Sequence, residues 1–121
     1  MLTDFPYTTY GEGFYRAIKR INTIGRPILV TENGIPDAKD DRRETFIKRY
    51  IYAMSQAIKD GCDVRGYYYW SLLDNFEWAE GYSMRFGLYA INFETQERTL
   101  REGAKAYQQI VEKHGRKPHV K

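Results

Sequence analysis

The chain has 121 residues, about the size of one ordinary domain, and with 29% charged and 42% hydrophobic residues its composition is globular rather than disordered. Its formal net charge of +3 is too small, and its Lys and Arg residues are too scattered, to indicate nucleic acid binding. No apolar run approaches the ~20 residues of a membrane span, and Met1 begins no signal-peptide pattern. The single cysteine excludes an internal disulfide. We therefore expect a cytoplasmic protein that contacts neither membrane nor nucleic acid.

The first half of the chain predicts a helix, a buried strand and a second helix. Over residues 11–25 apolar side chains recur every three or four positions, which indicates a one-sided helix. The stretch RPILVTENG then reads as a strand over residues 28–31 that is buried on both faces. After a polar loop, Asp41 followed by Glu44 predicts a capped helix that runs to about residue 60.

The second half predicts another strand, a hairpin and a last helix. Cys62 reads as a small buried side chain near the end of the second helix. A strand follows over residues 64–72, and it is again apolar on both faces. FGLYAINFETQERTL predicts a hairpin that turns near residues 94–96, and the last helix covers about 101–114. We expect residues 115–121 to be a frayed tail.

This order of elements predicts one partial α/β domain over residues 1–121 with a parallel sheet. Two parallel strands make a poor sheet, because both of them would be edge strands. Both nevertheless read as buried on two faces. The sequence therefore indicates a part of a larger sheet rather than a complete one.

Candidate reactive side chains follow the two predicted strands, where the chain leaves the sheet. Glu32 ends the first strand, and the segment YWSLLDNFEWAEGY, residues 69–82, follows the second. In parallel α/β folds these strand ends carry the reactive groups. The two Trp residues of the segment offer flat apolar surfaces to sugar rings, and Glu77 and Asn75 offer hydrogen bonds to sugar hydroxyls. For single residues a structural role is an equal alternative, with Asp74 as a helix cap and Glu77 solvated.

Three motifs closely resemble those of the family 1 glycoside hydrolases, which are retaining β-glycosidases with a TIM-barrel fold. The motifs are TENG after an aliphatic strand, WSLLDNFEW and GYSMRFGL. The resemblance extends from YGEGFYRAI to the last helix and is nearest to the β-glucosidase and β-galactosidase members. It implies that the chain is the C-terminal portion of a (β/α)8 barrel, with about the last two βα units and a preceding helix.

The resemblance also implies roles for individual residues. Glu32, in the TENG motif, matches the catalytic nucleophile, and Asn33 is a polar neighbour that supports it. The side chains that match the sugar site of the family are Trp70, Glu77, Trp78 and Phe86. The implied substrate is a terminal β-D-glycoside, and we expect neither a metal nor a cofactor.

The chain departs from the family in one respect. Retaining hydrolysis needs a second carboxylic acid about 5–5.5 Å from the nucleophile. The family carries it in an Asn-Glu-Pro motif on an earlier strand, and this tripeptide does not occur in the 121 residues. We therefore expect the chain to be inactive alone and to act with a complementary N-terminal barrel fragment, or to self-associate.

Two other functions remain open. The first is a non-catalytic carbohydrate-binding or scaffold fragment that keeps Trp70, Glu77 and Trp78 as a weak sugar platform. The second is a minimal hydrolase in which Glu77 is the acid. We disfavour it, because the apolar neighbours of Glu77 in NFEW suit a side chain that positions a ligand.

Overall fold

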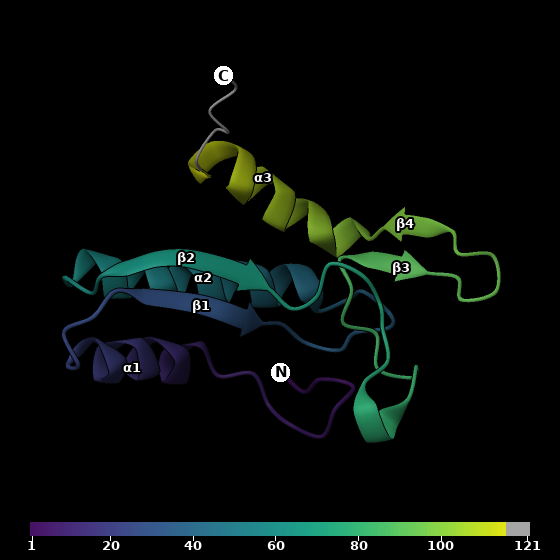
Figure 1. Ribbon diagram of the computed structural model, residues 1–121, viewed down its shortest axis with the longest axis horizontal. Coiled ribbons are helices and arrows are strands. Elements are labelled where there is room, and N and C mark those ends of the chain that lie inside the picture. The colour runs from purple at the N-terminus through teal and green to yellow at the C-terminus, as the bar shows by residue number, and fades with distance from the viewer. Residues whose placement is uncertain (116–121) are drawn as a thin grey trace.

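The computed structural model describes residues 1–115, so all of the predicted tail except Gly115 lies outside the described residues. Its helices and strands, in chain order, are α1 (Gly11–Asn22), β1 (Ile28–Asn33), α2 (Arg43–Lys59), β2 (Val64–Tyr69), β3 (Tyr89–Ile91), β4 (Arg98–Leu100) and α3 (Lys105–His114), with short 3-10 turns at Trp78–Glu80 and Glu102–Ala104 (Figure 1). No helix within the described part of the chain has the length and apolarity that crossing a membrane requires.

Strands β1 and β2 form a parallel pair, and α2 makes the crossover between them. Figure 1 shows α2 running along this pair, with α1 beside β1 and α3 beyond β2. Helix α2 also contacts both α1 and α3, so the three helices cover one face of the pair. The predicted order of helix, strand, helix, strand and helix is confirmed.

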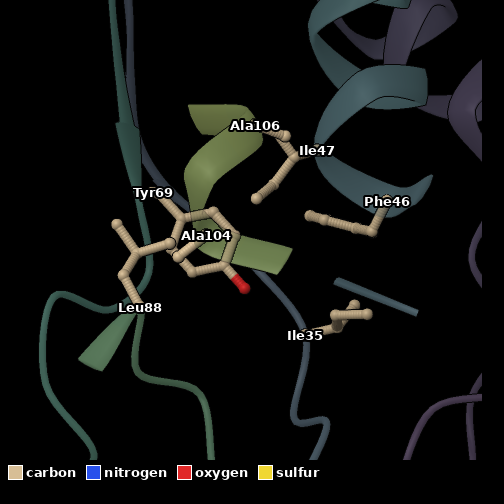
Figure 2. Close-up of a cluster of buried hydrophobic side chains, with 7 residues drawn as sticks. All are labelled: Ile35, Phe46, Ile47, Tyr69, Leu88, Ala104 and Ala106. Carbon is tan, nitrogen blue, oxygen red and sulfur yellow. The ribbon is translucent and has the colours of Figure 1, made fainter. Parts of the chain in front are cut away.

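Two groups of buried side chains fill the space between these helices and strands. The larger group consists of Ile35, Phe46, Ile47, Tyr69, Leu88, Ala104 and Ala106 (Figure 2). The smaller group consists of Ile18, Ile28, Ala57 and Cys62, and the predicted burial of Cys62 is confirmed. Both groups include residues of α2, which therefore forms the centre of the packing.

The face of the strand pair that points away from the helices is open. Leu29 of β1 is 57% exposed and Tyr68 of β2 is 60% exposed. No element within residues 1–115 covers this face, as expected for two strands that are apolar on both faces and belong to a larger sheet. The side chains on this face are as apolar as those of a protein interior, but they are exposed to solvent.

Strands β3 and β4 form the predicted hairpin. They pair antiparallel, with Tyr89 opposite Leu100. In the connecting turn the N–H of Asn92 donates to the carbonyl of Glu97 at 3.0 Å, and the N–H of Gln96 donates to the carbonyl of Asn92 at 2.7 Å. Two boundaries differ from the prediction. Strand β2 ends at Tyr69, because the chain turns away after it, and the first turn of the last helix is a 3-10 turn.

Candidate active site

One open cavity at the ends of β1 and β2 collects the predicted site residues. It has a volume of about 470 Å³ and is lined by Glu32, Asn33, Gly34, Trp70, Glu77, Trp78 and Phe86. The six residues to which the family resemblance assigns roles all line it, Asn75 does not, and Gly34 is the one addition. Glu32 is exposed at its edge, whereas Phe86 is buried.

A larger hollow of about 730 Å³ lies between α2, β2 and α3. Among the residues that the structure describes, those that line it include no carboxylate. Across residues 1–115 no group of three or more His, Cys, Asp or Glu side chains is placed to hold a metal ion. The cavity at Glu32 is therefore the better candidate for chemistry, although it is the smaller of the two.

The two strand ends approach each other so closely at Gly34 that no side chain fits there. The backbone N–H of Trp70 donates to the carbonyl of Asn33 at 3.0 Å. A Cβ atom on Gly34 would lie 1.7 Å from the carbonyl oxygen of Trp70. The glycine that follows Asn33 is thus a requirement of close backbone approach.

We predict that Gly34→Ala displaces the end of β1 and destabilises the chain by roughly 3 kcal/mol or more, above the usual cost of overpacking because the clash is with backbone. Thermal unfolding of the chain assembled with a complementary N-terminal barrel fragment measures this effect. Gly11→Ala is the matched control, because a Cβ at Gly11 would meet its nearest atom at an ordinary 3.7 Å. Equal midpoints for the two variants would contradict the prediction.

The loop after β2 is braced by its own polar groups. The amide nitrogen of Asn75 donates to Ser71 Oγ at 3.1 Å and to the carbonyl of Leu73 at 2.9 Å, and Ser71 Oγ donates to the same carbonyl at 2.8 Å. The peptide bond between Trp70 and Ser71 is cis. The amide donors that the sequence suggested for sugar hydroxyls are therefore used within the loop.

Trp78 stands on a tight turn at the rim of the cavity. The backbone N–H of Glu77 donates to the carbonyl of Gly81 at 2.7 Å, and the N–H of Gly81 donates to the carbonyl of Trp78 at 3.1 Å. Trp78 has a φ of 44°, in the left-handed region that residues other than glycine rarely adopt. Its side chain is 82% exposed, so the turn presents a flat apolar ring to solvent.

A buried carboxylate, Asp74, joins the separate segments of the site. It accepts two hydrogen bonds from the guanidinium of Arg101, at 2.8 and 2.9 Å, and one from the backbone N–H of Gly87 at 2.9 Å. A second guanidinium, from Arg85, lies 3.4 Å away. Burial by itself raises the pKa of Asp74, but these hydrogen bonds outweigh it, so the pKa lies below its ordinary value. The charged carboxylate thus holds the segment of Phe86 in place.

We predict that Asp74→Asn destabilises the fold by about 3 kcal/mol, because Arg101 is left without its charged partner in a buried position. Since the pKa of Asp74 is lower in the folded state, its contribution is complete above the unfolded pKa of ~3.9 and is lost as the pH falls through the folded-state pKa. With each protein assembled with a complementary N-terminal barrel fragment, the difference in thermal midpoint between the two should therefore be constant from pH 7 to about 5 and shrink below about pH 4.

The control is Asp63→Asn, because Asp63 also binds an arginine, Arg65, but both side chains are about half exposed. Exposed pairs contribute little, so this variant should match the wild type. A loss as large as that of Asp74→Asn would show that burial is not the cause.

A second buried carboxylate, Asp37, anchors the loop after β1 and caps α2. Its Oδ2 accepts hydrogen bonds from the backbone N–H groups of Arg42 and Arg43, at 2.9 and 2.8 Å. The predicted cap by Asp41 is therefore wrong, because the carboxylate that reaches the first-turn N–H groups comes from the loop. The buried guanidinium of Arg43 also donates to the carbonyl of Arg85 at 2.9 Å. The loops after β1 and β2 are thereby connected.

Comparisons with known proteins place these features in one family. Residues 1–116 match the model of glycosyl hydrolase family 1. The chain is 44% identical, over 115 residues, to the β-galactosidase of Pyrococcus woesei, which covers 94% of this chain and 22% of that protein. It is 36% identical, over 128 residues, to the 6-phospho-β-galactosidase of Lacticaseibacillus casei, which covers 93% of this chain and 27% of that protein.

Solved structures are similar to this chain as well. The crystal structure of the β-glucosidase from Pyrococcus furiosus is similar with a TM-score of 0.89 at 42% identity, over 92% of this chain and 24% of that chain. The chain thus spans about a quarter of the length of the curated relatives that it matches. The prediction of a partial TIM barrel is confirmed.

Proposed function

The chain belongs to glycosyl hydrolase family 1, and we propose that it supplies the nucleophile and part of the sugar-binding surface of a retaining β-glycosidase. The proposal assigns nucleophilic attack to Glu32 and sugar contacts to Trp70, Glu77, Trp78 and Phe86. The substrate class is a terminal β-D-glycoside, in keeping with relatives that are named β-galactosidase and β-glucosidase.

A single observation supports this proposal most strongly. Glu32 shares one cavity with the carboxylate of Glu77 and the rings of Trp70 and Trp78. Aromatic rings pack against the C–H faces of a sugar, and carboxylates accept hydrogen bonds from its hydroxyls. A third carboxylate of the same region, Asp74, already accepts two hydrogen bonds from Arg101, whereas Glu32 is exposed to the cavity.

In the proposed reaction Glu32 attacks the anomeric carbon of the bound sugar. The bond from that carbon to the leaving oxygen breaks, the leaving oxygen takes a proton from a second carboxylic acid, and a covalent glycosyl-enzyme forms. The second residue, now a carboxylate, then takes a proton from water. The water oxygen bonds to the anomeric carbon and releases Glu32.

The second carboxylic acid must come from outside these 121 residues, which contain no Asn-Glu-Pro. We propose that it lies on the N-terminal portion of the barrel, which also provides the other strands. The open face at Leu29 and Tyr68 and the free edges of β1 and β2 are the surfaces where those strands would pack and pair.

The test is complementation. The complementary chain in this test is the N-terminal portion of the Pyrococcus woesei relative, up to the region that matches this chain. The complex of this portion with the 121-residue chain is called the completed barrel. We predict that the completed barrel hydrolyses an aryl β-glucoside, whereas each chain alone is slower by at least about 10²–10⁴-fold, the usual value of general acid–base catalysis.

Assembly is measured separately, by size-exclusion chromatography with light scattering. A complex that assembles and binds a sugar without turnover would favour the non-catalytic, carbohydrate-binding alternative. A pure 121-residue chain with a turnover within tenfold of the completed barrel would refute the need for a second carboxylic acid.

A further inference from the structure

Strand β1 carries one residue more than β2 at the end that bears Glu32. Val30 pairs with Tyr67 and Asn33 pairs with Tyr69, so three steps along β1 match two steps along β2. The register also shifts in the opposite sense at the start of the pair, where the single step from Ile28 to Leu29 matches the two steps from Val64 to Gly66. The extra residue between Val30 and Asn33 is a β-bulge. A bulge interrupts the alternation of side chains, so that residues beyond it point to the opposite face from the one that strict alternation predicts.

Contacts on both sides of the bulge identify the face that each side chain takes. Ile28 is buried with Ala57 on the face that the helices cover. Strict alternation from Ile28 would place Glu32 on this covered face and Asn33 on the open one. The structure differs: the side chain of Asn33, a residue that also lines the cavity, accepts a hydrogen bond from Tyr67 of the covered face, and Glu32 is exposed at the open cavity.

Tyr67 holds the bulge from the covered face. Its hydroxyl donates to Oδ1 of Asn33 at 2.8 Å. Its ring packs against the larger buried group, and the centroids of the Tyr67 and Tyr107 rings are 6.1 Å apart. Because the carbonyl of Asn33 also accepts the hydrogen bond from Trp70, this residue is held through both its backbone and its side chain. The direction of Glu32 follows from the position of its fixed neighbour.

We propose that Tyr67 is a positioning residue for Glu32, because its hydroxyl fixes Asn33 on the covered face and thereby keeps the bulge that turns the carboxylate into the cavity. The inference rests on the proposed function, since it concerns the same nucleophile. Burial, together with the neighbouring tyrosines Tyr69 and Tyr107, raises the pKa of Tyr67 well above its ordinary value. The hydroxyl therefore stays protonated and remains a donor at neutral pH.

The test removes the hydroxyl and keeps the ring. In the completed barrel, Tyr67→Phe should lower kcat by roughly 10- to 100-fold, because a misplacement of about 1 Å can cost 10²-fold, while KM changes by less than about twofold. Asn33→Ala should give a similar loss. The double variant should lose no more than the larger single loss, because both substitutions remove the same hydrogen bond.

Tyr69→Phe is the matched control. Tyr69 lies two residues further along β2, and Figure 2 shows its ring within the buried group on the covered face. Within residues 1–115 its hydroxyl has no hydrogen-bond partner. This variant should therefore keep kcat within about twofold of the wild type, and its assembly and thermal midpoint show whether loss of a buried hydroxyl has a general effect.

The outcomes separate this inference from the proposed function. Wild-type kcat in Tyr67→Phe, an equal loss in Tyr69→Phe, or additive losses in the double variant would each overturn the positioning role. If the completed barrel turns over and Glu32→Gln does not, the proposed function stands whatever Tyr67→Phe does. An inactive completed barrel, or an active Glu32→Gln variant, would overturn both.

Discussion

Glu32→Gln in the completed barrel should lower kcat/KM for an aryl β-glucoside by roughly 10⁴-fold or more, the scale on which loss of a catalytic nucleophile acts. The glutamine side chain has nearly the same shape, but its amide cannot form the ester with the anomeric carbon. Because Glu32 is exposed and lies beyond the buried groups, assembly of the two chains should be unchanged. Initial rates and a fluorescence titration of assembly measure the two effects separately.

Two control variants localise this effect. Glu80→Gln changes an exposed carboxylate in the loop after β2, which is not among the residues that line the cavity, and activity should stay at the wild-type level. Glu77→Gln changes the proposed sugar ligand, so KM should rise and kcat should fall by less than in Glu32→Gln. Full activity in a reassembled Glu32→Gln complex would show that the nucleophile has been assigned to the wrong residue.

The 121-residue chain, studied without its complementary chain, should not behave as a stable compact monomer. Leu29 and Tyr68 are exposed in the middle of the strand pair, and Leu72 and Phe76 are also more than half exposed. At about 25 cal/mol per Å², roughly 400 Å² of uncovered interior forgoes on the order of 10 kcal/mol. A whole domain has a net stability of roughly 5–15 kcal/mol, so the loss is of the same size.

We therefore expect the chain alone to be either loosely packed with a broad thermal transition or self-associated, and to gain a sharp transition when the complementary chain is added. Light scattering establishes the mass of the species, and near-ultraviolet circular dichroism follows the packing of its aromatic side chains. A sharp cooperative melt from a lone monomer at micromolar concentration would contradict this expectation.

The sequence predicted the order of the elements because their signals are local. A one-sided apolar pattern marks each helix, and short aliphatic or aromatic runs mark β1 and β2. Burial could not be predicted in the same way. Leu29 and Tyr68 have the same apolar character whether or not another strand covers them, so the structure was needed to show which side chains of this face are exposed.

The cavity could be predicted because its residues belong to contiguous motifs at two strand ends, which parallel pairing brings together. The side chains that support it are far apart in sequence. Arg101 binds a carboxylate 27 positions away, and Tyr67 binds Asn33 across 34 positions. Neither pair forms a local pattern, and the bulge before Asn33 depends on the register with β2, which a single strand does not encode.

The identity of the residue that becomes glycosylated tests the central claim most directly. The completed barrel would react briefly with a β-glycoside whose leaving group is activated and whose C2 substituent slows hydrolysis of the intermediate, and peptide mass spectrometry would locate the adduct. The proposed mechanism predicts one glycosyl group on the peptide that contains Glu32, attached to that residue. Turnover with an adduct on another residue, or turnover without any covalent adduct, would contradict it.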